Sequence, residues 1–197
     1  MKVFLLQRKR LTALACALAA AAMFYVVNYP AAVSAYATDR QLPIYCVQRD
    51  QKMLSISFDA AWGNEDTQQL IDILGKYNVK ATFFVVGSWV DKYPESVKAL
   101  HDAGHEVMNH SNDHAHMSQL SKEEIIADVE ACNDKIEAVT GVRPTLIRPP
   151  YGEYDNNVIT AIRSIGMEPI QWDVDVSQTA SSAWYTTVCW KISAGQI

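Results

Sequence analysis

The sequence predicts an α/β domain built on a parallel sheet, and two observations support this fold class. From residue 53 onward, short apolar runs alternate with longer segments whose apolar residues recur at helical spacing. That order is typical of parallel strands joined by right-handed crossover helices, arranged either as an open doubly wound sheet or as a barrel. With 197 residues, 49% hydrophobic and 20% charged, the chain is long enough for one such core.

Five short apolar runs are the predicted strands. The first covers 53–58 and alternates apolar with polar residues, which is typical of a strand with one buried face. The other four are shorter and lie at 81–86, 106–108, 145–147 and 168–172.

Four helices are predicted between these strands, because apolar residues there lie three or four positions apart. Their apolar stripes are Leu70, Ile71, Leu74 and Tyr77; Val97 and Leu100; Ile125, Val129, Cys132 and Ile136; and Val158, Ile159, Ile162 and Ile165. Pro94 marks the start of the second helix, and residues 121–124 form a capping box at the start of the third. Residues suited to a left-handed helix end follow the four helices: Asn78, Gly104, Gly141 and Gly166.

Residues 1–37 are predicted to be a signal peptide or signal anchor. Four basic residues within the first ten precede an uncharged run from 11 to 37, which ends in the small-x-small cleavage site Ala35-Tyr36-Ala37. Cleavage secretes the chain, whereas an uncleaved segment anchors it in the membrane with the domain on the extracytoplasmic face, and the sequence leaves both open. Residues 38–50 are expected to be a linker, followed by the domain at 51–175.

Charge and cysteine content narrow the classes of partner. The formal net charge is -5 and the basic residues beyond the first ten are scattered, so we expect no nucleic-acid partner. Cys46, Cys132 and Cys189 lack the Cys-x-x-Cys spacing of a zinc knuckle or redox pair. We expect them to be small apolar fillers, with at most one disulfide.

Polar residues follow three predicted strands at their C-terminal ends. Asp59 follows the first strand, His110 and His114 the third, and Arg148 the fourth. Because parallel strands end at the same edge of a sheet, we expect these side chains to meet. Two neutral imidazoles and one more ligand can hold a zinc-class ion, and a carboxylate oriented by Arg148 can act as a general base. The backbone at Tyr151 can offer an amide to an oxyanion.

Each of these residues also has a structural interpretation. Taken alone, a His-x-x-x-His pair is most often two surface or capping imidazoles, Asp59 can cap a helix, and residues 148–150 can be a rigid turn. Their coincidence at three strand ends favours a functional site.

The remaining histidines and two tryptophans have weaker signals. His101, His105 and His116 show no partner pattern and are expected to be solvated or packed. Trp62 and Trp172 either line a cleft or, as is commoner for aromatic residues, belong to the core.

Three motifs at these strand ends resemble those of a known enzyme family. Ser57-Phe58-Asp59, His110-Ser111-x-x-His114 and Arg148-Pro149-Pro150-Tyr151-Gly152 resemble the first three motifs of the polysaccharide deacetylase family, also called the NodB-homology domain or carbohydrate esterase family 4. The resemblance covers 50–175. The variant Ser-Phe-Asp-Ala-Ala-Trp-Gly at 57–63 is similar to sporulation-associated membrane or exported deacetylases of spore-forming Gram-positive bacteria.

The resemblance implies a fold, a reaction and a role for each matching residue. The implied fold is a distorted (β/α) barrel of the glycoside hydrolase/deacetylase type, incomplete at its C-terminus. The implied reaction is metal-dependent hydrolysis of N-acetyl groups on GlcNAc or MurNAc units of peptidoglycan or a chitin-like glycan. Asp59 matches the catalytic base, Arg148 its partner and Tyr151 the oxyanion amide, while His110 and His114 match two ligands of a zinc- or cobalt-class divalent metal.

Two departures from the family pattern lower the expected activity. Family members carry a second Asp after the base as the third metal ligand, whereas this chain has Ala60, so we expect weakened metal binding. Asp113, in the histidine loop, is a candidate substitute. The family pattern is interrupted after Asp175, and 176–197 are expected to be a divergent tail produced by a frameshift, without the family's general-acid histidine.

These departures predict little or no deacetylase activity in this chain. The alternative is a non-catalytic relative that binds glycan or assembles at the envelope. A sheet that stops at its fifth strand is also expected to leave an open edge.

Overall fold

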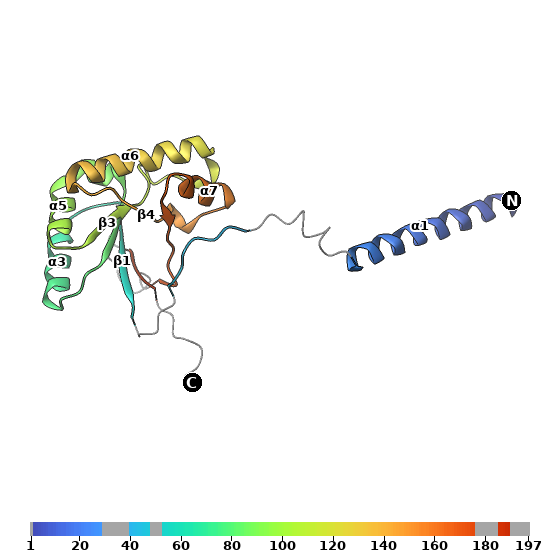
Figure 1. The fold of residues 1–197 in the computed structure, drawn as a ribbon, viewed down its shortest axis with the longest axis horizontal. Coiled ribbons are helices and arrows are strands. Elements are labelled where there is room, and N and C mark those ends of the chain that lie inside the picture. Colours follow the sequence, from blue (N-terminus) through green and yellow to red (C-terminus); the bar gives the residue numbers. More distant parts are fainter. Residues whose placement is uncertain (1, 29–39, 48–52, 176–184, 190–197) are drawn as a thin grey trace, which may run out of the picture. The chain divides into compact units, whose positions relative to one another are not determined.

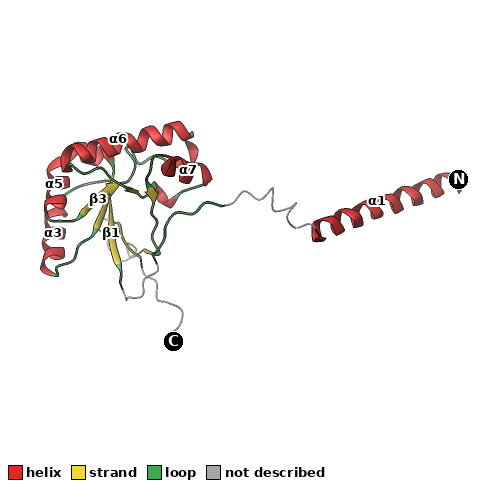
Figure 2. Cartoon of the chain, viewed as in Figure 1, coloured by secondary structure: helices red, strands yellow, loops and turns green. Residues whose placement is uncertain are grey.

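The computed structural model describes residues 2–28, 40–47, 53–175 and 185–189, which fall into two compact units, Met1–Arg40 and Gln41–Ile197. The first unit contains helix α1 (Lys2–Asn28). Among the residues that the structure describes, no helix has the length and hydropathy needed to cross a membrane. The second unit contains the sheet and all the other helices (Figures 1 and 2).

Five parallel strands form the centre of the second unit, as predicted. They are β1 (Ser55–Ala60), β2 (Thr82–Val85), β3 (Glu106–Asn109), β4 (Leu146–Ile147) and β5 (Glu168–Pro169). Each pairs in parallel with the next along the chain, so the C-terminal ends of all five lie at one edge. The α/β fold class is therefore confirmed.

Two antiparallel strands continue the sheet beyond β1, so the full order is β5-β4-β3-β2-β1-β7-β6. Strand β7 (Tyr185–Cys189) pairs along β1, and β6 (Val174–Asp175) pairs with β7. The expectation that the sheet stops at a fifth strand is wrong, because part of the expected tail supplies β7. Hydrogen bonding to a strand so distant in the sequence leaves no local pattern.

A short segment also pairs beside β5. The amide of Ile44 donates to the carbonyl of Pro169 at 2.9 Å, and the amide of Gln171 donates to the carbonyl of Ile44 at 2.8 Å. Ile44 lies within 38–50, the expected linker, and forms a parallel bridge with Ile170. This part of the segment is thus hydrogen-bonded to the domain.

Helices pack around the outside of the sheet (Figure 1). The four predicted helices are α3 (Thr67–Lys76), α5 (Pro94–Asp102), α6 (Lys122–Thr140) and α7 (Asn156–Ser164). One further helix, α4 (Gly87–Lys92), was not predicted because its six residues carry no apolar stripe. The capping box of α6 is present, and all four predicted end residues have a positive φ, as a left-handed helix end requires.

Successive side chains of β1 point alternately to the core and to the site, on opposite faces of the sheet. Phe58 and Ala60 belong to the buried apolar cluster between the sheet and helices α3 to α6, where Phe58 stacks on Phe83 at 5.1 Å. Ser57 and Asp59, one residue out of step, face the opposite side of the sheet, since successive side chains of a strand alternate. A second cluster packs β4 against α6 and α7.

Candidate active site

The structure brings Asp59 and Arg148 together as a buried ion pair. Arg148 donates from Nη1 to Asp59 Oδ1 at 2.6 Å and from Nη2 to Ser57 Oγ at 2.8 Å. The Arg148 side chain is 2% exposed and that of Asp59 11%. Such a charge-assisted contact fixes the carboxylate in one orientation, as a general base requires. The interpretation of Asp59 as a helix cap is wrong.

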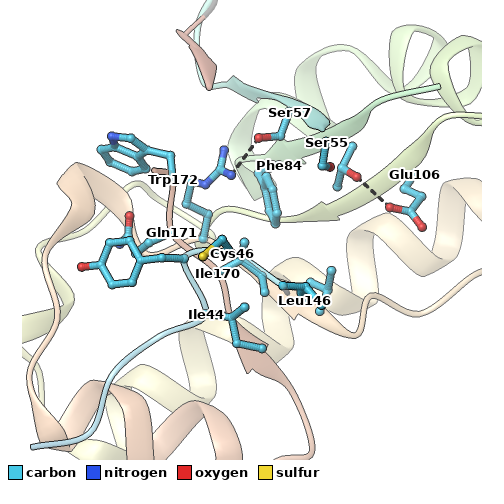
Figure 3. Close-up of a pocket in the computed structure, with 14 residues that line it drawn as sticks. Ile44, Cys46, Ser55, Ser57, Phe84, Glu106, Leu146, Ile170, Gln171 and Trp172 are labelled. Atoms are coloured by element: carbon cyan, nitrogen blue, oxygen red, sulfur yellow. Dashed lines mark hydrogen bonds between the residues drawn. The ribbon is translucent and has the colours of Figure 1, made fainter. Parts of the chain in front are cut away.

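Aromatic rings hold the guanidinium of Arg148 in place. Its central carbon lies 4.2 Å from the ring centroid of Phe84 and 5.7 Å from that of Trp172. A cavity of about 210 Å³ opens beside it on the sheet face away from the core, lined among others by Ser57, Phe84 and Trp172 (Figure 3). The side chain that orients the base is therefore itself rigidly packed.

His110 is held in a defined tautomer. Its Nδ1 lies 2.6 Å from the carbonyl oxygen of Arg148, and because a carbonyl only accepts, Nδ1 carries the proton. The lone pair on Nε2 is left free, and this atom lies 4.0 Å from Asp59 Oδ2. Burial lowers the pKa of His110, so the imidazole is neutral at neutral pH. A carbonyl-anchored neutral imidazole is a typical metal ligand.

His114 faces His110 across the same site. Their ring centroids are 5.1 Å apart, and burial, followed by the neighbouring His110, lowers the pKa of His114 to about 4. Within the described part of the chain, no group hydrogen-bonds the buried Nδ1 of His114. The two histidines thus present neutral nitrogen donors close to Asp59.

The loop that carries both histidines is tied to helix α6. Asn109 Oδ1 accepts from the amide of Ser111 at 2.7 Å, and Asn109 Nδ2 donates to Asn133 Oδ1 at 2.8 Å. Asp128 accepts from the Ser111 hydroxyl at 3.3 Å and from the Asn112 amide at 3.1 Å. These bonds hold Ser111 at a φ of 73°, a conformation uncommon for a non-glycine residue.

Tyr151 follows β4 and lies beside His114, with ring centroids 4.5 Å apart. Its φ of 60° places the backbone of the turn after Arg148 in the left-handed region. His116 stacks on the Tyr151 ring at 4.1 Å with an interplanar angle of 8°, and its Nδ1 lies 3.0 Å from Glu153 Oε2. His116 is therefore packed, in agreement with the expectation, although its partners on a distant loop leave no local pattern in the sequence. His105 is likewise packed, against Phe83.

The two tryptophans near the site differ in exposure. Trp62 is 57% exposed and tilts over His114 at 5.3 Å, so of the two predicted places, a cleft or the core, the core is excluded. Trp172 is partly buried and lines the cavity beside Arg148.

The donor set does not complete the expected metal site. Among the described residues, no cluster of three His, Cys, Asp or Glu side chains is placed to hold a metal ion. Ala60 offers no donor atom, and Asp113 is exposed, where it accepts from Asn112 Nδ2 at 2.8 Å. His110 and His114 alone provide two neutral donors, one fewer protein ligand than zinc sites normally have.

Comparison with known proteins agrees with this geometry. Residues 47–170 match the family model described as polysaccharide deacetylase. The chain is 36% identical over 156 residues to the uncharacterized protein YlxY of Bacillus subtilis, covering 78% of this chain and 49% of YlxY. It is 39% identical over 129 residues to the peptidoglycan-N-acetylmuramic acid deacetylase PdaC of the same species, covering 66% of this chain and 27% of PdaC. The chain thus spans half or less of the length of these relatives.

Solved structures similar to this chain include one described as a pseudoenzyme and one described as a deacetylase. BA3943 from Bacillus anthracis, described as a pseudoenzyme of carbohydrate esterase family 4, superposes with a TM-score of 0.67 at 36% identity, over 70% of this chain and 50% of that one. The peptidoglycan deacetylase PdaC superposes with a TM-score of 0.60 at 38% identity, over 68% and 65% of the two chains.

Proposed function

Because this chain belongs to the polysaccharide deacetylase family, we propose that it binds N-acetylated peptidoglycan or chitin-type glycan at the Asp59–Arg148 pair and hydrolyses its N-acetyl groups slowly. One observation carries the proposal. The buried pair that orients the base is intact, while Ala60 stands where the family resemblance places the third metal ligand. The site therefore keeps the oriented general base and lacks the anionic metal ligand.

The chain's own residues supply three parts of the hydrolysis. Asp59 takes a proton from water as the water oxygen attacks the acetyl carbonyl carbon, and Arg148 holds Asp59 in position. The amide of Tyr151 donates to the developing oxyanion. Collapse of the tetrahedral intermediate breaks the carbon–nitrogen bond while the proton that Asp59 took from water passes to the leaving nitrogen, so acetate is released and an amine is left on the sugar.

Weak metal binding is part of this proposal. Deacetylases of the family are generally metal-dependent. Here the donors are the two neutral imidazoles of His110 and His114, so a zinc- or cobalt-class dication gains no charge-assisted bond from position 60. We expect slow turnover for this reason.

Export across the membrane is the second part of the proposal. The basic start, the uncharged run and the Ala35-Tyr36-Ala37 site support cleavage and secretion, and peptidoglycan lies outside the membrane. An uncleaved N-terminal anchor gives the same extracytoplasmic location. Similarity of the 57–63 motif to sporulation-associated deacetylases supports a role in spore formation. Sequencing the N-terminus of the exported protein tests cleavage after Ala37.

A non-catalytic glycan-binding protein is the second candidate. The observation that favours it is the incomplete donor set, together with the likeness to the pseudoenzyme BA3943. Both candidates require the same glycan to bind, so turnover alone separates them.

The deciding experiment measures binding and acetate release on the same protein. The full chain is titrated calorimetrically with tetra-N-acetylchitotetraose and then assayed for acetate with cobalt present. Binding with slow release supports the deacetylase, and binding with no release above the Asp59→Asn variant supports the non-catalytic candidate. Absence of binding contradicts both.

A further inference from the structure

The turn that carries Tyr151 holds two successive residues in the left-handed region. Tyr151 has a φ of 60° and a ψ of 4°, and Gly152 has a φ of 68°. The amide of Glu153 donates to the carbonyl of Pro150 at 3.1 Å and closes the turn. Positive φ at both central residues is the type I′ geometry, which glycine and asparagine normally occupy. A tyrosine there is disfavoured by roughly a factor of ten, because its Cβ crowds the backbone.

The same closing hydrogen bond is compatible with a different turn. In a type II turn, the first central residue has an ordinary negative φ, and only the second, here Gly152, needs a positive one. The sequence Tyr151-Gly152 therefore suits type II better than the type I′ turn that it adopts. The two turns orient the amide of Tyr151 differently, because its φ changes sign between them. A contact outside the turn therefore stabilises the observed geometry.

That contact is made by His116, on the loop after β3. Its ring stacks on the Tyr151 ring with centroids 4.1 Å apart and an interplanar angle of 8°. His116 Nδ1 lies 3.0 Å from Glu153 Oε2, and because a carboxylate only accepts, this nitrogen carries a proton. The Ser118 hydroxyl donates to the same oxygen at 3.3 Å. Glu153 is thus connected, through His116, to the ring of its own turn.

The backbone of His116 is anchored in the core. Met117, the next residue, is fully buried in the apolar cluster that packs β4 against α6 and α7. The carbonyl of His116 accepts from the amide of Gln119 at 3.0 Å. The stacked imidazole therefore stands on a packed segment, and its ring is a fixed surface for Tyr151.

We propose that His116 and Glu153 are positioning residues that keep Tyr151 in the type I′ turn and so orient its amide toward the developing oxyanion. The inference rests on the proposed function, in which that amide is the oxyanion donor. Both side chains act through the Tyr151 ring and not on the substrate. Because the oxyanion is absent from the bound substrate, loss of this His116–Glu153 clamp should lower kcat and leave KM nearly unchanged.

Removal of the imidazole should let the turn relax to type II. When the left-handed conformation of Tyr151 falls to about a tenth of the population, kcat in His116→Ala falls by about tenfold. Glu153→Ala releases the imidazole from its acceptor and should lower kcat less. Glu153→Gln keeps an oxygen that accepts from Nδ1 and should restore kcat.

Acetate release and NMR spectroscopy of the full chain test the clamp. We would measure kcat and KM for tetra-N-acetylchitotetraose with cobalt in wild type, His116→Ala, Glu153→Ala and Glu153→Gln. The amide and α protons of one residue lie closer together at positive φ than at negative φ, so their nuclear Overhauser effect at Tyr151 reports the turn directly. Asn78, with a φ of 53°, and Tyr93, with a φ of −133°, are internal references for the two cases.

Asp102→Ala is the matched control. It removes the exposed 2.6 Å ion pair between Asp102 and Lys98. Asp102 is the last residue of α5 and precedes the start of β3, so it lies at the opposite edge of the sheet from the site. Both kcat and the Overhauser effect at Tyr151 should match those of the wild type.

The outcomes separate the clamp from the proposed function. An about tenfold lower kcat in His116→Ala, with KM unchanged and a weaker Overhauser effect at Tyr151, supports the positioning role. An unchanged Overhauser effect, or a weaker one with wild-type kcat, overturns it. A weaker Overhauser effect in His116→Ala, when the wild type releases no acetate above Asp59→Asn, overturns the proposed hydrolysis and supports the clamp on the Tyr151 backbone.

Discussion

Replacing Ala60 by Asp directly tests why this site is expected to turn over slowly. Ala60 is 1% exposed at the end of β1, in the apolar cluster that contains Phe58, Val85 and Val86. A carboxylate added there without a metal is an unpaired buried charge, which costs about 3 kcal/mol or more. For a chain of this size, about 1 kcal/mol corresponds to about 2–4 °C in Tm. We expect Tm to fall by about 6–12 °C in EDTA.

Metal should reverse this loss, because the family resemblance places an anionic metal ligand at position 60. A metal present at about 100 times its Kd stabilises the folded state by about 2.7 kcal/mol, or about 5–11 °C on the same scale. Wild type, with two neutral donors, should shift much less at the same metal concentration. Thermal unfolding followed by circular dichroism, with cobalt or with EDTA, measures both changes.

Ala60→Asn is the matched control, since its side chain is similar in size and polarity and has no charge. A cobalt-induced shift in Ala60→Asp no larger than that in Ala60→Asn would refute the argument that a missing anionic ligand limits this site. Acetate release with cobalt is the second readout, and we expect it to rise in Ala60→Asp alone.

Three further predictions concern buried groups around the site and in the core. Arg148→Met leaves the carboxylate of Asp59 buried without its partner and should cost about 3–5 kcal/mol in urea unfolding; a cost below 1 kcal/mol contradicts the pairing. Gly152→Ala should lose at least about 1 kcal/mol more than Gly141→Ala, because both have a positive φ but only the first places a Cβ against an aromatic ring; equal losses contradict this. Burial raises the pKa of Cys132 to about 12, so its thiol should react with a disulfide reagent only after unfolding, as mass spectrometry of the labelled protein will show.

Local signals explain how much of the fold could be predicted. The capping box at Ser121 and the left-handed ends at Asn78 and Gly166 involve neighbours in sequence, and the structure confirms them. Strand β7 could not be predicted, because it is defined by hydrogen bonds to β1, about 130 residues away in the sequence. The pairing of Ile44 beside β5 was missed for the same reason.

The sequence predicted only those residues of the candidate site that directly follow a parallel strand. Asp59, His110 and Arg148 were expected to meet because each follows a parallel strand, and the structure brings them together. The stack of His116 on Tyr151 joins two loops, and neither residue carries a local sign of the other. The available signal was the position of His116, which lies only two residues after His114 in the sequence.

The bonds from α6 to the histidine loop have a consequence for how such sites change over evolutionary time. Asn133 and Asp128 hold that loop through Asn109, Ser111 and Asn112, and none of these contacts involves position 60. The residue at position 60 can therefore change while the histidine loop keeps its shape, because the two depend on different contacts.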